Sequence, residues 1–129
     1  MGWQTNYEAW PDVETLVPAL LRDRLGDAAD HVGNFRHEHW AGRIVVVRRD
    51  GGGVKGVFDR PRLSVRVWVD DAYECIDLAR EVRSHVLALP GSEGITRATV
   101  MSGPNLIQDD GGPQAYLMCE LTVRASATP

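Results

Sequence analysis

The stretch 62–91 constrains the fold of this chain most, because it joins one strand to one helix. Apolar and polar residues alternate from Leu63 to Val69, and this period of two predicts a strand with a single apolar face. After Asp71 the apolar residues recur at helical spacing, up to the stop at Pro90. The two apolar faces consist of Leu63, Val65, Val67 and Val69 on the strand, and of Cys75, Ile76, Leu78, Ala79, Val82, Val86 and Leu89 on the helix. We therefore expect the strand and the helix to bury these faces against each other.

Both ends of this helix carry recognisable signals. Asp71 stands where an N-cap belongs, and Glu74 follows three residues later, which is the spacing of a capping box. Pro90 and Gly91 cannot extend the helix, so they mark its end.

A first helix is predicted near the start of the chain, from Asp12 or Thr15 to about Arg24. Pro18 complicates this prediction, since proline inside a helix costs about 3 kcal/mol but is tolerated in the first turn. The helix therefore either starts near Val17 or bends at Pro18.

Four other segments show features of strands or of strand connections. Residues 31–40 hold a short strand, and the run around 43–49 has the strongest β character in the chain. Residues 95–102 and 114–125 alternate as strands, and the turn-rich loop 103–113 between them predicts an antiparallel hairpin.

The predicted order of elements is α-β-β-β-α-β-β, in one domain spanning residues 12–125. We expect an α+β fold, in which two helices cover one face of a mostly antiparallel sheet of four to five strands. Residues 1–11 form an N-terminal extended arm in this prediction, and residues 126–129 form a tail.

Composition indicates an ordinary globular domain, with 43% hydrophobic and 25% charged residues and a formal net charge of -4. The only cysteines, Cys75 and Cys119, fall on predicted apolar faces, so we expect free thiols packed in the core. The first residues lack the basic and apolar regions of a secretory signal, and no apolar run is long enough to span a membrane. These patterns predict a protein made in the cytoplasm.

The middle of the chain is rich in basic residues. We interpret the glycine-rich segment 50–61 as a flexible loop, which is either a mobile hairpin tip or an arm that orders against another subunit. A phosphate-binding loop is not expected, because no Gly-Lys-Ser/Thr ending is present. The basic residues around this segment are Arg43, Arg48, Arg49, Lys55, Arg60, Arg62 and Arg66. They form either a solvated face or a surface for phosphate or an acidic partner.

Residues that could carry chemistry are few. On a strand, His37 and His39 would point to the same side and, with nearby His31 and Glu38, could hold a metal. Histidines in a polar, turn-flanked segment are common, so a polar surface strand is the interpretation we favour.

The paired acids and the serines also have structural explanations. Helix capping accounts for Asp70-Asp71, and a turn accounts for Asp109-Asp110. Ser92 and Ser102 have no histidine base beside them in the sequence. We expect no catalytic, cofactor or metal site, and no enzymatic activity.

The order and spacing of several weak motifs resemble the tail terminator proteins of long-tailed bacteriophages, particularly phages of actinobacteria. The resemblance covers residues 12–125. It rests on the strand Leu63–Trp68, the helix 72–89 with its Asp77–Arg83 run and its Leu-Ala-Leu-Pro-Gly end, the segment Val100–Pro104 and the strand Tyr116–Val123.

This resemblance implies a structural virion protein at the head–tail junction. Such a protein forms a ring, usually of six copies, that caps the tail tube, stops its polymerisation and provides the surface on which the filled head docks. The implied partners are further copies of the chain, the major tail tube protein and the head-completion or stopper protein. Viral double-stranded DNA passes through the channel without sequence-specific binding. No membrane is involved.

In that setting we expect an interface with the tube, with a neighbouring subunit or with the channel. The candidate residues are Arg48, Arg49, Gly52, Lys55, Val57, Phe58, Arg60, Arg66, Trp68, Tyr116 and Met118. Three alternatives stay open: a head-side connector or stopper of the same neck, a plain interaction module, and a small metal-dependent enzyme using residues 31–39.

Overall fold

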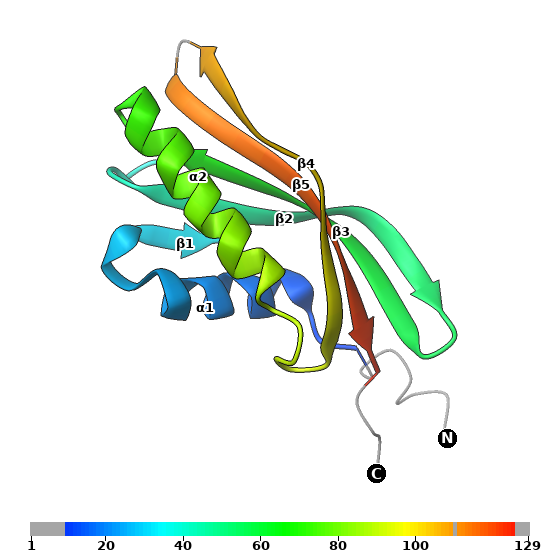
Figure 1. Ribbon diagram of the computed structural model, residues 1–129. Coiled ribbons are helices and arrows are strands. Elements are labelled where there is room, and N and C mark those ends of the chain that lie inside the picture. Colours follow the sequence, from blue (N-terminus) through cyan, green and yellow to red (C-terminus); the bar gives the residue numbers. More distant parts are fainter. Residues whose placement is uncertain (1–9, 110, 126–129) are drawn as a thin grey trace.

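Two helices pack on one face of a five-stranded mixed sheet, in a computed structural model that describes residues 10–109 and 111–125 (Figure 1). The elements are α1 (Val13–Leu25), the short 3₁₀ helix η2 (Gly26–Ala28), β1 (His31–Gly33), β2 (Ile44–Lys55), β3 (Phe58–Trp68), α2 (Ala72–Leu87), β4 (Ile95–Asp109) and β5 (Gly112–Arg124). The predicted α+β fold and its order of elements are confirmed. Of the expected terminal segments, 1–9 and 126–129 lie outside the described residues.

The strands lie in the order β1-β2-β3-β5-β4. Only β1 and β2 run parallel, and the other three pairs are antiparallel. The two long hairpins, β2–β3 and β4–β5, meet at the pairing of β3 with β5, which places β3 and β5 at the centre of the sheet. The short β1 and the long β4 form its edges.

Alternation along the central strands divides the sheet into a covered and an open face. Leu63, Val65 and Val67 of β3 are fully buried and belong to one apolar cluster with the buried residues of both helices. Leu117 and Cys119 continue this cluster on β5. Burial of these faces supplies the main driving force for folding, and the predicted packing of the strand 63–69 against the helix after Asp71 is confirmed.

The first helix, α1, begins at Val13, earlier than the alternative start that we predicted near Val17. Asp12 is its N-cap, and its Oδ1 accepts a hydrogen bond of 3.0 Å from the backbone N–H of Glu14. Pro18 therefore lies inside the helix, at a buried position. The proline lacks one helical donor, and its burial with the core offsets that loss.

The second helix starts as predicted, with a difference in its cap. Asp71 Oδ1 accepts a hydrogen bond of 3.0 Å from the backbone N–H of Glu74. The Glu74 carboxylate does not complete the expected capping box, because it accepts a hydrogen bond of 2.9 Å from Arg43.

The segment 50–61 forms the end of a hairpin, which was one of the two interpretations, but it is not the predicted loop, because β2 and β3 continue as paired strands to a tight turn at Gly56-Val57. A bulge between Arg49 and Gly52 accommodates the glycines. Gly52 has φ +84°, and a Cβ there would lie 1.9 Å from the carbonyl oxygen of Arg60. The glycines thus allow close strand pairing at a bulge and do not interrupt the hairpin.

The predicted loop at 103–113 is also mostly strand. β4 continues to Asp109, and β5 begins at Gly112. Register shifts around Ser102 absorb the irregular backbone at Gly103. There a Cβ would lie 2.6 Å from the carbonyl oxygen of Tyr116. Turn-type residues here mark bulges within a strand.

Candidate interaction surfaces

The open face of the sheet brings together four of the predicted interface residues. Trp68 is paired with Gln114, Arg66 with Tyr116, and Ser64 with Met118. Arg66, Trp68, Tyr116 and Met118 therefore lie on adjacent strands, on the side away from the helices. The Arg66 guanidinium donates a hydrogen bond of 3.0 Å to Oε1 of Gln114, which ties the two strands together on this face.

A segment that sequence reasoning did not connect with this face covers one end of it. The Arg36 guanidinium lies over the Trp68 ring, 4.7 Å from its centroid. The ring of Trp40 stacks on His31, with centroids 4.7 Å apart. Residues 34–43 contain no periodic pattern, so only the aromatic and basic residues hinted at this packing. Trp68 is consequently less available to a partner than its place on an open face suggests.

Unpaired arginines dominate the rest of the open face. Arg60, Arg62 and Arg66 lie at alternate positions of β3, and Arg97 lies on β4. Across the described residues none of the four forms an ion pair. Glu120 of β5, opposite Arg62, places one carboxylate among them. This part of the surface is therefore positively charged.

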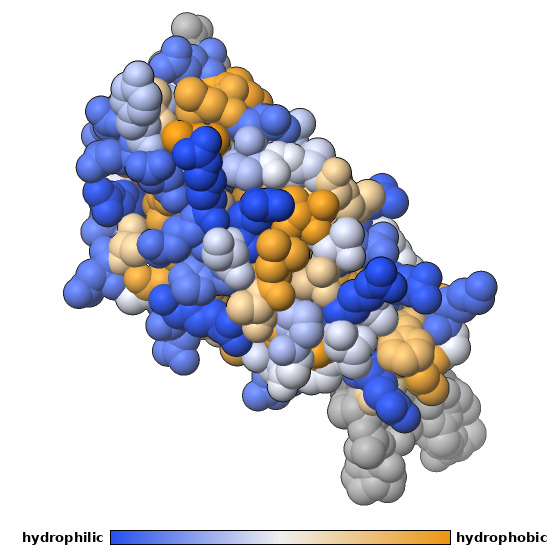
Figure 2. All heavy atoms as spheres, viewed as in Figure 1, coloured by the Kyte–Doolittle hydropathy of each residue, from blue (hydrophilic) through white to orange (hydrophobic). Residues whose placement is uncertain are grey.

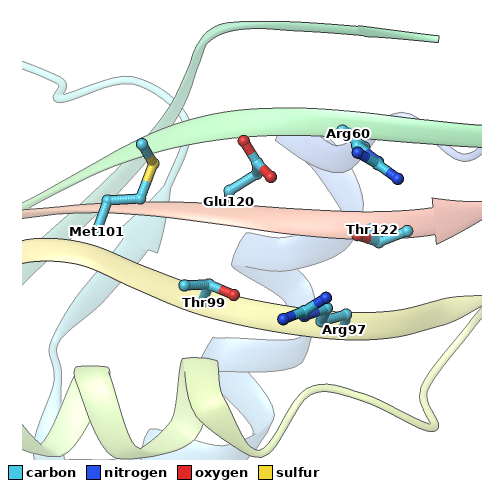
Figure 3. Close-up of a pocket in the computed structure, with 6 residues that line it drawn as sticks. All are labelled: Arg60, Arg97, Thr99, Met101, Glu120 and Thr122. Carbon is cyan, nitrogen blue, oxygen red and sulfur yellow. The ribbon is translucent and has the colours of Figure 1, made fainter. Parts of the chain in front are cut away.

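Two of these arginines line a shallow hollow of about 330 Å³. Figure 3 shows Arg60 and Arg97 on opposite sides of Thr122, with Glu120 farther along β5. The remaining lining residues are Thr99 and Met101. The hollow thus offers two guanidinium groups and two hydroxyl groups that suit a carboxylate or another anion, and the Glu120 carboxylate offsets part of this positive charge. Arg97 was not among the predicted interface residues, because the sequence did not reveal which β4 residues oppose β5.

The β2–β3 hairpin projects beyond the body of the domain (Figure 1). Its base is held by Arg49, which donates two hydrogen bonds of 2.8 Å to the two carboxylate oxygens of Asp59. The Asp59 side chain is only 4% exposed. The hydrogen bonds and charge of Asp59 raise the pKa of Arg49 above its ordinary value. Arg49 therefore stabilises the hairpin, and its charge is neutralised within the subunit.

The tip of this hairpin exposes apolar side chains. Val54 and Val57 are 53% and 51% exposed, and Lys55 lies beside them. Phe58 is half-buried and pairs with Arg124. The carbonyl oxygen of Val57 accepts hydrogen bonds from Trp10 Nε1, at 3.2 Å, and from the backbone N–H of Ala125, at 2.8 Å. The tip is thus anchored through its backbone while its apolar side chains face outward.

Arg48 pairs with the first helix instead of the hairpin. Its Nε lies 3.2 Å from Oε2 of Glu14, and both side chains are partly exposed. Exposed pairs of this kind contribute about 0–1 kcal/mol.

The histidines that could hold a metal do not form the arrangement predicted from the sequence. β1 ends at Gly33, so the strand that was to place His37 and His39 on one side does not extend to them. Their ring centroids are 5.6 Å apart, in an exposed turn. Among the described residues no group of three or more histidine, cysteine, aspartate or glutamate side chains is arranged to hold a metal ion.

The two cysteines are free and buried, as predicted. Burial raises the pKa of the Cys119 thiol to about 12. Burial also raises the pKa of Cys75, whose Sγ donates a hydrogen bond of 3.4 Å to the carbonyl oxygen of Val67. Both side chains therefore act as small apolar residues in the core.

Neither models of protein families nor curated proteins gave a match to this chain. No helix in the described residues has the length and apolar character needed to cross a membrane.

Proposed function

We propose that this protein is a structural component of a bacteriophage tail, a terminator that forms a ring, usually of six copies, at the end of the tail tube. In this role it stops tube polymerisation and provides the surface on which the head docks. The proposal starts from the resemblance of residues 12–125 to tail terminator proteins. Its partners are further copies of the chain, the tube protein and a stopper protein on the head side.

The observation that carries the proposal is the projecting hairpin with its exposed apolar tip. Val54 and Val57 are exposed and lie outside the core cluster of the described residues, so a partner could bury them. The partly buried pair of Arg49 and Asp59 fixes the base of the hairpin. An ordered, apolar projection costs little entropy to dock, because its backbone is already fixed before the partner arrives. Figure 2 shows hydrophobic spheres at this tip, surrounded by hydrophilic ones.

The test is to mix the purified protein with tail tubes and image the tube ends. The wild-type protein should cap one end of each tube and stop further growth. Val57→Asp places a carboxylate on the tip and should weaken capping about tenfold, which corresponds to about 1.4 kcal/mol. Ala19→Asp adds the same charge to an exposed position of α1 and should cap normally.

Tubes that keep growing in the presence of wild-type protein would refute the terminator role. Binding to the head instead of the tube would favour the connector alternative. Equal capping by Val57→Asp and Ala19→Asp would show that the hairpin tip does not contact the tail tube.

A further inference from the structure

The two sides of the domain carry opposite charge. On the open sheet face, Arg60, Arg62 and Arg97 form no ion pair or side-chain hydrogen bond within the described part of the chain. The helices on the other side carry an excess of acids. These acids are Asp12, Glu14, Asp23, Asp27, Asp71, Glu74, Asp77 and Glu81, on α1, η2, α2 and their caps.

Three of these acids line a second hollow, of about 250 Å³, between α2 and η2. Glu74, Asp77 and Glu81 line it, together with Arg43. Arg43 pairs with Glu74 at 2.9 Å, whereas Asp77 lies 3.7 Å from an exposed Arg80. Glu81 lies 3.9 Å from His85, which is charged only when protonated. On this side of α2, Glu74 is closely paired, whereas Asp77 and Glu81 are only weakly paired.

An exposed aromatic side chain lies next to these acids. Tyr73 is 82% exposed, although tyrosine usually buries most of its ring. It lies one helical turn before Asp77, so both point away from the core on the outer side of α2. Tyrosine is enriched at the centres of protein interfaces and packs well against guanidinium groups.

We infer that the arginine-lined sheet face of one copy docks against the acidic outer face of α2 of a second copy. In this contact Tyr73 enters the hollow between Arg60 and Arg97, and the carboxylates of Asp77 and Glu81 face the arginines. The inference rests on the proposed ring and names the surfaces that would form it.

The charges of the two faces and their positions in the domain favour a second copy of the chain as the partner. The two faces lie on opposite sides of the sheet, so the contact joins different patches and runs head to tail. Head-to-tail contacts close into rings when the rotation allows it. A contact between two copies of the same face would bring arginines against arginines, or acids against acids, and is disfavoured.

A charge-swap experiment tests the contact. One variant carries Arg60→Glu and Arg97→Glu, and the other carries Asp77→Arg and Glu81→Arg. Alone, each variant opposes like charges and should associate about 100-fold more weakly than wild type, as measured by sedimentation over a range of concentrations. An equimolar mixture restores opposite charges at every contact and should recover association.

Two further variants serve as controls. The chain with all four reversals keeps the wild-type net charge and should associate with itself. Asp23→Arg with Arg83→Glu reverses two exposed charges outside the proposed contact and should leave association unchanged. Circular dichroism of each variant verifies that it is folded.

The inference is overturned if the wild-type chain stays monomeric, if either reversed variant associates like wild type, or if the mixture fails to recover. It is also overturned if the variant with Arg60→Glu and Arg97→Glu loses binding to duplex DNA while its self-association is unchanged. The two arginines would then bind DNA phosphates and not a second copy of the chain. The terminator role fails separately, if assembled wild-type protein leaves tube ends uncapped.

Discussion

The two faces of the sheet are made from alternate residues of the same strands. They differ in how many of their side chains find a partner within the described chain. On the covered face Leu63 and Val65 are fully enclosed by the helices. On the open face Arg62 and Arg66 alternate with them and find no carboxylate partner in the described chain. Burial of the first face drives folding, and the second is the face that we propose for association. The difference teaches that one strand can serve stability and binding at once, because its period of two separates them.

The largest expected effect comes from a charge placed on the covered side. Val82 of α2 is fully buried. Val82→Asp forces an unpaired carboxylate into the core, at a cost of several kcal/mol that rivals the whole stability of a domain. We expect loss of helical circular dichroism and of a cooperative thermal transition. Arg83→Asp, at the next and exposed position, should remain folded. A stable Val82→Asp would show that the covered side of α2 is wrongly assigned.

Neighbouring residues of β3 compare the two faces directly. Leu63→Ala leaves a cavity in the core and should lower the free energy of unfolding by about 2–5 kcal/mol. Ser64→Ala, on the open face, should change it by about 0.5 kcal/mol or less. Urea unfolding measures both. Similar losses from the two substitutions would contradict the division into a covered core face and an open face.

At the base of the β2–β3 hairpin, the ion pair of Arg49 with Asp59 lies on the covered side of the sheet. Asp59→Asn removes the carboxylate that neutralises Arg49 and should cost about 1–3 kcal/mol. Hydrogen exchange should then quicken at the amides of the 50–61 hairpin before it does in the central strands. Asp50→Asn, at an exposed position nearby, is the matched control. Equal exchange in the two variants would mean that the pair does not hold the hairpin.

The smallest expected effect concerns alkaline pH. The folded-state pKa of Cys119, about 12, lies above the ordinary value of 9.0, so the neutral thiol favours the folded state. This stabilisation is complete below pH 9 and is lost as pH rises toward 12, by about 1.4 kcal/mol for each pH unit in that window. Urea unfolding between pH 8 and 10.5 measures the slope. Cys119→Ala should show a flatter pH dependence, and identical slopes would contradict the burial of this thiol.

Several elements could be read from the sequence because their signals are local. The alternation at 63–69 and the Asp71 cap predicted β3 and the start of α2, and the structure confirms both. The glycine-rich segments at 50–61 and 103–113 are mostly strand, although their turn-type residues predicted loops. Glycine signals a turn and a bulge alike, and only the partner strand decides between them. The bulge near Ile95 likewise moves that residue to the covered side, away from Arg97.

The candidate surfaces were only partly predictable for a related reason. Trp68, Tyr116 and Met118, which the sequence indicated as candidate interface residues, do lie on one face, because the alternation of each strand is visible in the sequence. Arg97 and the hollow beside Arg60 were missed, because they depend on the order and register of β3, β5 and β4. Arg49 was expected at an interface, but its ion pair with Asp59 joins residues ten positions apart across the hairpin.

The sequence by itself determined which residues alternate, where the second helix begins, and that the chain forms an α+β domain, since these follow from spacing and capping within a few residues. Only the tertiary structure decided where the first helix begins, which arginines stay unpaired, where acids and bases gather, and that the glycine-rich segment is paired strand at the end of a projecting hairpin. These features depend on contacts between distant strands. Long-range pairing sets register and charge placement, and the spacing of residues along the chain does not encode it directly.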